Sequence, residues 1–286
     1  MEPMDMLKYY SPKHTVSTPS DKYRKSGYNK SRFGYIRYII VPELCLMKSI
    51  LITGANKGIG FEVARQMAEK GYFVFVGCRN AKNGNEAIAK LHEQGLIHCE
   101  FLKIDVSDAL SVKQAAEAVA AKTDALDILI NNAAIAGEQP QTAATYDTTM
   151  LKGLFNVNYF GVIQTTQAFL PLLKKSSQPV IVNVSSEMGS LAMQTSAGRN
   201  ANRDLYHAYS ATKTALNSFT IFLAQELKDI PVKVNSVTPG YTATGLNNFT
   251  GFKTAAQGAI PIVRLATIGK DGPTGQFFRE EGEVPW

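Results

Sequence analysis

The chain has 286 residues, of which 45% are hydrophobic and 19% charged, so it can build a core and is unlike a disordered, collagen-like or disulfide-stapled protein. Its three cysteines, Cys45, Cys78 and Cys99, are widely spaced without a CxxC pair, which favours a reducing compartment, the cytoplasm, and no metal site. Apolar runs stay shorter than the roughly 20 residues of a membrane-spanning helix. The net charge is +6, but residues 1–46 carry +4 of it. The charge that remains on residues 47–286 is too small to indicate a nucleic-acid-binding surface.

Residues 1–46 differ in composition from the rest of the chain. They contain six of the twelve tyrosines and show no sustained periodicity, so we predict a disordered or non-native N-terminal extension. Met47 directly precedes the first predicted strand, and 47–286 is the expected catalytic domain. A mistaken start codon and a basic arm that binds a membrane surface or an acidic partner are both compatible with the extension.

Short apolar runs alternate with helical patterns after Met47. The predicted strands are 48–53, 72–77, 98–104, 126–131, 179–185 and 232–237, with a weaker seventh at 275–278. The predicted helices are 58–70, 82–94, 109–122, 150–174 and 207–228. This alternation predicts a single α/β domain of the Rossmann type, doubly wound, with about seven mostly or fully parallel strands and helices on both faces.

A glycine-rich turn joins the first predicted strand to the first predicted helix. Glycines let the backbone approach a pyrophosphate, and the free N–H groups at a helix start favour its charge. The same glycines could form only a tight turn, but their place between strand and helix favours a dinucleotide. The cofactor-binding residues expected here are Gly54, Asn56, Lys57, Gly58, Ile59 and Gly60.

The residues after the second predicted strand indicate which dinucleotide binds. An acidic residue about 20 positions past the glycines holds the ribose hydroxyls of NAD, whereas a 2′-phosphate requires a base. No acid occurs between Glu69 and Glu86, the second strand ends at Arg79, and Lys57 adds a cation in the turn. These two cations predict NADP(H), unless both are merely solvated surface charges.

Tyr209 and Lys213 are four residues apart at the start of a predicted helix. This spacing puts phenol and ammonium on one helix face, where the ammonium can stabilise a phenolate. Tyr9 and Lys13 have the same spacing, but Pro12 lies between them and no strand precedes them, so we interpret that pair as a chance match. Ser186 ends another predicted strand, where its hydroxyl could hold a substrate carbonyl or simply form a turn.

With these motifs, residues 47–286 resemble the short-chain dehydrogenase/reductase family. The TGxxxGxG turn begins at Thr53, and further family motifs follow in order at Asp105-Val106, Asn131-Asn132-Ala133, Asn158 and Pro239-Gly240. The resemblance implies a catalytic tetrad of Asn158, Ser186, Tyr209 and Lys213. Tyr209 would donate the proton, Ser186 orient the carbonyl, Lys213 grip the nicotinamide ribose and depress the tyrosine pKa, and Asn158 hold a water.

The resemblance also implies the remaining cofactor contacts. Asp105 would lie near the adenine and Asn131 near the adenosine ribose, while Pro239 and Gly240 would flank the nicotinamide. The full set outside the glycine turn and Arg79 is Asp105, Val106, Asn131, Ala133, Tyr209, Lys213, Pro239, Gly240 and Thr242.

Three features depart from the common family pattern. Ala134 replaces a glycine, Ser186 and Tyr209 are 23 residues apart where about a dozen is usual, and residues 1–46 have no counterpart. The longer spacing and the ending at Trp286 resemble the carbonyl-reductase-like subgroup, whose members are often monomeric. We therefore expect a monomer, although homo-oligomers are usual in the family.

The expected activity is the NADPH-dependent reduction of a ketone or aldehyde. A dehydrogenase working in the oxidative direction and a non-catalytic NADP-binding regulator are the alternatives, the second disfavoured by the intact tetrad. Residues 241–261 should cover the substrate, and Lys253 is their one charged residue, which suits a neutral, fairly apolar carbonyl compound. These residues could instead pack as a helix on the core.

Overall fold

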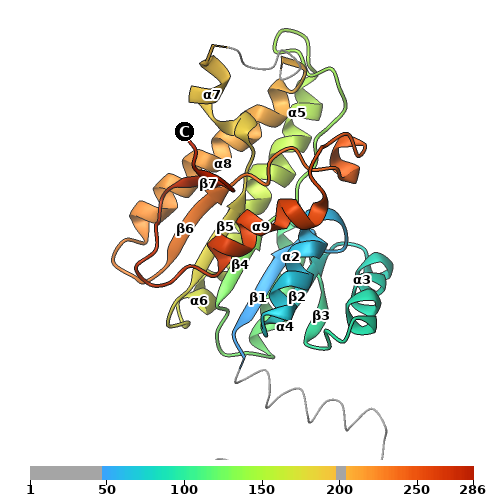
Figure 1. Cartoon of the computed structure of the whole chain (residues 1–286), viewed down its shortest axis with the longest axis vertical. Coiled ribbons are helices and arrows are strands. Elements are labelled where there is room, and N and C mark those ends of the chain that lie inside the picture. Colours follow the sequence, from blue (N-terminus) through green and yellow to red (C-terminus); the bar gives the residue numbers. More distant parts are fainter. Residues whose placement is uncertain (1–46, 198–203) are drawn as a thin grey trace, which may run out of the picture. The chain divides into compact units, whose positions relative to one another are not determined.

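The computed structural model describes residues 47–197 and 204–286. The predictions for residues 1–46 therefore lie outside the described residues, as does most of the insertion before Tyr209. Within the described part, all strands belong to one sheet in the order β3-β2-β1-β4-β5-β6-β7-β8. The doubly wound α/β fold predicted from the alternation is confirmed (Figure 1).

The strands match the predicted runs closely. They are β1 (Ser49–Thr53), β2 (Phe73–Cys78), β3 (Cys99–Lys103), β4 (Ile128–Asn131), β5 (Val180–Val184), β6 (Lys233–Val237), β7 (Phe277–Arg279) and β8 (Gly282–Glu283). Every pairing is parallel except that of β7 with β8. The additional strand β8 has only two residues, too few for a sequence pattern to reveal.

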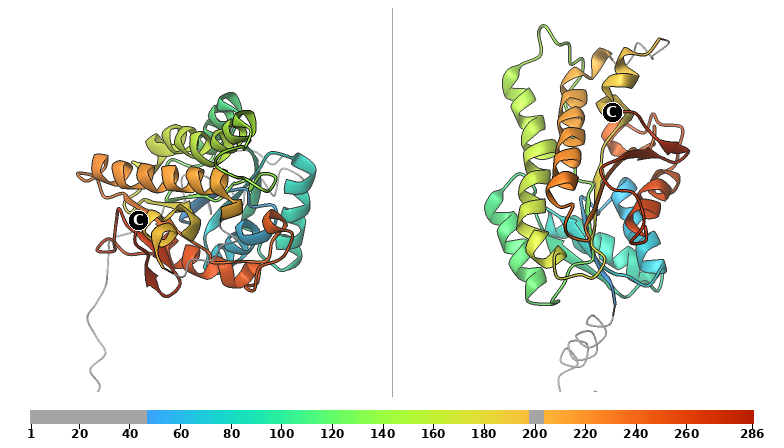
Figure 2. Two further views of the ribbon diagram at one scale, coloured as in Figure 1. Left: turned by 90° about the horizontal axis from the view of Figure 1, so that it is seen from above. Right: turned by 90° about the vertical axis from the view of Figure 1, so that its left-hand side faces the viewer.

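Helices cover both faces of the sheet. They are α2 (Gly58–Glu69), α3 (Ala81–Glu93), α4 (Ala109–Ala120), α5 (Thr148–Phe155), α6 (Gly161–Leu173), α7 (Leu191–Thr195), α8 (His207–Glu226) and α9 (Ala255–Ala266). The helices α2, α3 and α9 pack on one face, and α4, α6 and α8 on the other (Figure 2). Short turns of 3-10 helix, η3 (Glu187–Gly189) and η5 (Gly245–Asn247), lie in the loops after β5 and β6.

Two helical segments differ from the prediction. The long helix predicted over 150–174 is interrupted by a π-helical turn, η2 (Asn156–Phe160), between α5 and α6. The helix α9 was not among the predicted helices, because its apolar residues were assigned to a substrate-covering segment. It packs against α2 and buries Ile262, Val263 and Leu265 in the core on that face.

The parallel register brings the strand ends to one edge of the sheet. Thr53 of β1 is aligned with Gly77 of β2, and Val184 of β5 with Val237 of β6. The loops that follow these strands carry nearly all the predicted site residues. They consequently meet at the carboxyl edge, where open α/β sheets bind their ligands.

Candidate functional site at the carboxyl edge

The glycine turn after β1 has the backbone geometry that its sequence predicts. Gly54 and Gly58 have φ values of +66° and +59°, a region that other residues avoid. A Cβ on Gly60 would lie 2.5 Å from Asn132 Nδ2 and 2.6 Å from the Gly54 carbonyl oxygen. The turn is thus a tight backbone cradle at the start of α2.

Asn132 holds this cradle in place, a role that the sequence did not single out. Its Nδ2 donates to the carbonyl oxygens of Thr53 at 2.9 Å and Gly54 at 3.2 Å. The backbone N–H groups of Asn132 and Ala133 both donate to Thr53 Oγ1 at 3.0 Å. The predicted contact residue Ala133 therefore lies directly against the turn, 2.9 Å from the position of a Cβ on Gly54.

The beginning of α2 is suited to an anion. Lys57 is the N-cap residue of α2, and its side chain makes no capping hydrogen bond to the first turn of the helix. The first N–H groups of a helix lack intrahelical partners and carry the positive end of its dipole. The backbone N–H groups of this first turn are thus available to a phosphate. The residues around them are Asn56, Ile59 and the glycines of the turn.

The two predicted cations both act electrostatically on the thiol of Cys78, at the end of β2. Burial raises the pKa of the Cys78 thiol, while the charges of Arg79 and Lys57 both lower it. Arg79 also contributes to lowering the pKa of Asp105, although the hydrogen bond from Ser107 has the larger effect. Both cationic side chains are exposed, so a ligand at this edge can reach them.

Asp105 and Val106 follow β3, as predicted. Asp105 Oδ1 accepts hydrogen bonds from the Ser107 amide at 3.0 Å and the Ser107 hydroxyl at 2.6 Å. Val106 is buried, and its carbonyl oxygen accepts a hydrogen bond from Gln164. A Cβ on Gly161 would lie 2.9 Å from that oxygen, so the loop packs tightly on α6.

Asn131 is the last residue of β4, and its side chain is held inside the protein. Its side chain is buried, and Nδ2 donates to Thr166 Oγ1 at 3.1 Å and Asn183 Oδ1 at 2.9 Å. Successive side chains of a strand point to opposite faces, and this one points toward α6. A contact between the adenosine ribose and this side chain would require it to leave these partners.

Ser186, Tyr209 and Lys213 come together from two elements. Tyr209 and Lys213 lie one turn apart on α8, both buried, with Lys213 Nζ 5.7 Å from the centre of the tyrosine ring. Ser186, just after β5, forms a side-chain hydrogen bond with Tyr209. The Lys213 ammonium donates to the Val184 carbonyl oxygen at 2.8 Å. The sequence therefore identified three side chains that share one site.

Burial has the largest effect on the pKa values of both Tyr209 and Lys213. It raises the pKa of Tyr209 to about 12, with the Ser186 hydrogen bond acting in the opposite direction. It lowers the pKa of Lys213 to about 7. The depression of the tyrosine pKa by the lysine, which the resemblance implied, is not among the effects seen at Tyr209.

Asn158, the fourth member of the predicted tetrad, lies in the π-helical turn and is fully buried. Its Oδ1 accepts from the Ile135 N–H at 2.9 Å, and its Nδ2 donates to the Ile135 carbonyl oxygen at 2.9 Å and to Thr212 Oγ1 at 3.1 Å. Both amide hydrogens are thereby used. The side chain holds the loop after β4 against α8 and has no hydrogen left to donate to a water.

The loop after β6 contains the remaining predicted residues. Pro239 is half-buried, Gly240 has a φ of +76°, and Thr242 Oγ1 lies 3.3 Å from the carbonyl oxygens of both. Lys253 Nζ is 3.2 Å from the position of a Cβ on Gly240. That lysine forms an ion pair with Glu280 Oε2 at 2.8 Å, so its charge has a partner within the protein.

The segment 241–261, expected to cover the substrate, divides into a loop and the start of a helix. Residues from 255 onward form α9, which realises the alternative of a helix packed on the core. The part before α9 carries exposed apolar side chains. Further exposed apolar residues occur in the loops after β4 and before α8; together they are Ile135, Leu205, Tyr241, Leu246, Phe249 and Phe252.

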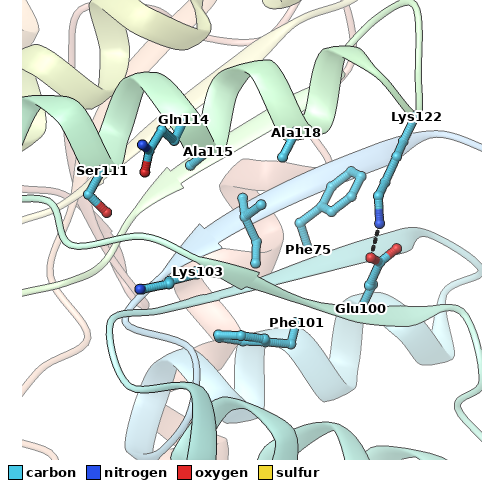
Figure 3. Close-up of a pocket in the computed structure, with 10 residues that line it drawn as sticks. Phe75, Glu100, Phe101, Lys103, Ser111, Gln114, Ala115, Ala118 and Lys122 are labelled. Carbon is cyan, nitrogen blue, oxygen red and sulfur yellow. Dashed lines mark hydrogen bonds and ion pairs between the residues drawn. The ribbon is translucent and has the colours of Figure 1, made fainter.

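A hollow of about 320 Å³ lies elsewhere, between β3 and α4 at the outer edge of the sheet. Figure 3 shows Phe75, Ala115 and Ala118 along it and the ion pair of Lys122 with Glu100 at one end. None of the predicted site residues lines it. In residues 47–197 and 204–286, no cluster of three His, Cys, Asp or Glu could hold a metal ion, and no helix is long and apolar enough to cross a membrane.

Comparison with known proteins gives matches over most of the described chain. A family model described as short chain dehydrogenase matches residues 48–253. The (+)-neomenthol dehydrogenase of Capsicum annuum is 31% identical, over 80% of this chain and 94% of that protein. Salutaridine reductase of Papaver bracteatum is 30% identical, over 83% and 97%.

Solved structures resemble the fold equally well. Salutaridine reductase from Papaver somniferum superposes with a TM-score of 0.71 at 28% identity, covering 82% of this chain and 99% of that one. The NADPH-bound carbonyl reductase from chicken fatty liver gives a TM-score of 0.73 at 25% identity, covering 84% and 99%.

Proposed function

Because the chain belongs to the short-chain dehydrogenase family, we propose that it reduces a neutral, fairly apolar ketone or aldehyde with NADPH, Tyr209 being the proton donor. The observation that carries this proposal is the group of Ser186 with the buried Tyr209 and Lys213 at the carboxyl edge of the sheet. Similarity to reductases such as salutaridine reductase supports the direction.

The residues at this edge fit a dinucleotide. Positive φ at Gly54 and Gly58 shapes the turn, Gly60 lets it close against Asn132, and the start of α2 directs backbone N–H groups toward a pyrophosphate. The similar carbonyl reductase from chicken fatty liver binds NADPH, and a similar short chain dehydrogenase from Shigella flexneri binds NADP. When bound, NADPH supplies the hydride that the carbonyl carbon accepts.

The side chains of the site then have separate tasks. Ser186 donates a hydrogen bond to the substrate carbonyl oxygen, and the Tyr209 hydroxyl gives that oxygen its proton as general acid. The high pKa of Tyr209 keeps the hydroxyl protonated at neutral pH, as a proton donor requires. Lys213 stabilises the phenolate that remains after proton transfer.

Preference for NADPH over NADH rests on Arg79 and Lys57. Both side chains are exposed, and both act electrostatically on Cys78 at the end of the second strand. A 2′-phosphate would gain charge-assisted contacts from them, and no acid after the second strand competes for the ribose.

The substrate class follows from the loops around Tyr209. Exposed apolar side chains gather in them, and the single lysine of the loop after β6 is already paired with Glu280. The lysine of that loop is therefore not free to bind a carboxylate or phosphate substrate. The similar neomenthol dehydrogenase and salutaridine reductase are consistent with an apolar carbonyl compound.

We further propose that the enzyme works as a cytoplasmic monomer. Cys78 and Cys99 are buried free thiols, in keeping with a reducing compartment. The long spacing between Ser186 and Tyr209 supports the monomer. Light scattering at micromolar concentration tests this state, and a stable tetramer would contradict it.

Replacing Tyr209 by phenylalanine tests the proposed function. Tyr209→Phe removes the proton donor and keeps the ring, so kcat should fall by about 10²- to 10⁴-fold while NADPH binding, followed by fluorescence, stays nearly intact. Tyr9→Phe is the matched control, since Tyr9 belongs to the other Tyr-x-x-x-Lys pair. Equal losses in the two variants, or no loss in the first, would refute the assignment. A panel of carbonyl compounds, with NADPH oxidation recorded optically, identifies the substrates.

A further inference from the structure

Gln141 lies in the loop between β4 and α5 and is fully buried. Its backbone N–H donates to the Leu205 carbonyl oxygen at 2.8 Å, and its carbonyl oxygen accepts from the His207 N–H at 3.2 Å. Its side chain donates from Nε2 to the Ala136 carbonyl oxygen at 2.6 Å and accepts at Oε1 from the Tyr209 N–H at 2.9 Å. One residue thus joins the loop after β4 to the chain that enters α8.

The contact with Tyr209 replaces a helix cap. Tyr206 is the N-cap residue of α8, and no local side chain among the described residues caps the helix. The Tyr209 N–H is at the third helical position, where an N-cap side chain usually accepts the bond. Gln141 supplies the acceptor from 68 residues away. A tertiary contact therefore determines where the helix of the proton donor begins.

The carbonyl group of Tyr209 is also held by hydrogen bonds. The Tyr209 carbonyl oxygen accepts from Thr212 Oγ1 at 2.7 Å, and that hydroxyl accepts in turn from Asn158 Nδ2 at 3.1 Å. Asn158 binds both backbone polar groups of Ile135. Two buried amides, Gln141 and Asn158, therefore connect adjacent residues of the loop after β4 to the first turns of α8.

We propose that Gln141 is a positioning residue for proton transfer, fixing the backbone of Tyr209 without touching substrate or cofactor. The inference rests on the proposed role of Tyr209 as proton donor. Reaction rates depend steeply on the placement of reacting groups, and a displacement of about 1 Å can lower a rate about 100-fold. Loss of the buried acceptor would leave the Tyr209 N–H without a partner and favour such a displacement.

Two substitutions separate the contacts of the side chain. Gln141→Met keeps the length and removes both hydrogen bonds, so kcat should fall roughly ten- to hundredfold, with NADPH affinity within about twofold of the wild type. In Gln141→Glu, the protonated carboxyl group can accept from the Tyr209 N–H and donate to the Ala136 carbonyl oxygen. The ionised form cannot donate and repels that oxygen.

Gln141→Glu should consequently show near wild-type kcat at low pH and lose activity as the introduced carboxyl group ionises. Burial raises the pKa of such a group above its usual value of about 4.3. The kcat profile of this variant should thus contain an ionisation that the wild-type profile lacks. Circular dichroism at each pH should show the variant still folded across this ionisation, which separates it from pH-dependent unfolding.

Gln66→Met is the matched control. It removes a glutamine hydrogen bond of 3.0 Å to the Ala256 carbonyl oxygen, between α2 and α9, and should leave kcat unchanged. A folded Gln141→Met variant with kcat within about twofold of wild type would overturn the inference. If that variant does not fold, a Gln141→Glu profile identical to the wild type would overturn it. Activity retained in Tyr209→Phe would instead reject the proposed function itself.

Discussion

The two halves of the site are assembled from different kinds of contact. In the cofactor half, β1–β3 with α2–α4, the predicted contacts come from backbone groups of a glycine turn and from two exposed cations. In the catalytic half, β4–β6 with α5, η2, α6 and α8, they come from buried polar side chains such as Asn158, Gln141 and Lys213. Long-range hydrogen bonds hold both halves, since Asn132 reaches the cofactor turn across 78 residues or more and Gln141 reaches Tyr209 across 68.

The difference indicates how each half should respond to substitution. Backbone geometry depends on the absence of side chains, so the cofactor half should be most sensitive where a glycine gains a methyl group. A buried polar side chain needs its partners, so the catalytic half should be most sensitive where a hydrogen bond or a charge is removed. The following predictions are arranged by expected effect.

The largest effect should follow from Gly60→Ala in the cofactor half. The new methyl group would lie 2.6 Å from the Gly54 carbonyl oxygen, so the turn must shift. We expect a roughly ten- to hundredfold rise in the NADPH Kd and about 1–3 kcal/mol less stability, measured by fluorescence titration and urea unfolding. For the control Gly153→Ala, no described atom lies within 4 Å of the new methyl group, and unchanged binding is expected. Equal Kd values in both variants would contradict the dependence on backbone shape.

A smaller effect should follow from Arg79→Asp. The substitution removes a cation from the end of β2 and adds the charge that favours NADH, so the ratio of kcat/KM for NADPH over NADH should fall more than about tenfold. Lys90→Asp makes the same charge change on α3 and should leave the ratio intact. An unchanged ratio in Arg79→Asp would show that the exposed cations of the cofactor half do not select the cofactor.

In the catalytic half, the buried Lys213 should make the stability of the protein depend on pH. The pKa of Lys213 falls from 10.5 to about 7 on folding, so the unfolded chain binds more protons between these values. Stability should increase with pH over this window, by at most about 1.4 kcal/mol per unit. Tyr209 acts oppositely but only above pH 10, where the unfolded phenol ionises first. Urea unfolding at several pH values should give a flatter dependence for Lys213→Met; identical slopes would contradict the prediction.

The smallest effect is expected when translation begins at Met47. The first strand, β1, starts at Ser49, and the sequence pattern places the catalytic domain at 47–286. Activity and melting temperature should equal those of the full chain, and mass spectrometry of the native protein would show which N-terminus is used. A loss in either quantity would show that residues 1–46 contribute to one of the two halves.

What the sequence predicts follows another division, that between local patterns and long-range contacts. The strands and the glycine turn were predictable, because strand periodicity and positive φ leave local signatures at positions such as Gly54. Tyr209 and Lys213 were predictable from their spacing once a strand was placed before them.

The contacts that support these residues were not predictable from the sequence. Gln141 reaches Tyr209 across 68 residues, and Asn132 holds the glycine turn across 78 or more, with no local pattern that marks either amide. The direction of the Asn131 side chain depends on which face of β4 it occupies, and its buried partners come from α6 and β5. The helix α9 was missed because its apolar residues fit a substrate cover as well as a packed helix.

The π-helical turn Asn156–Phe160 also affects how this sequence is compared with others. A π turn contains one residue more than the α-helix it interrupts, so α5 and α6 are out of phase with each other. Removing one residue here would give a regular helix in which Leu154 of α5 and Phe169 of α6 both keep their buried faces. An alignment with a relative that lacks the π turn must therefore place a one-residue gap here. Without that gap it assigns the wrong face to every side chain on one side of the turn.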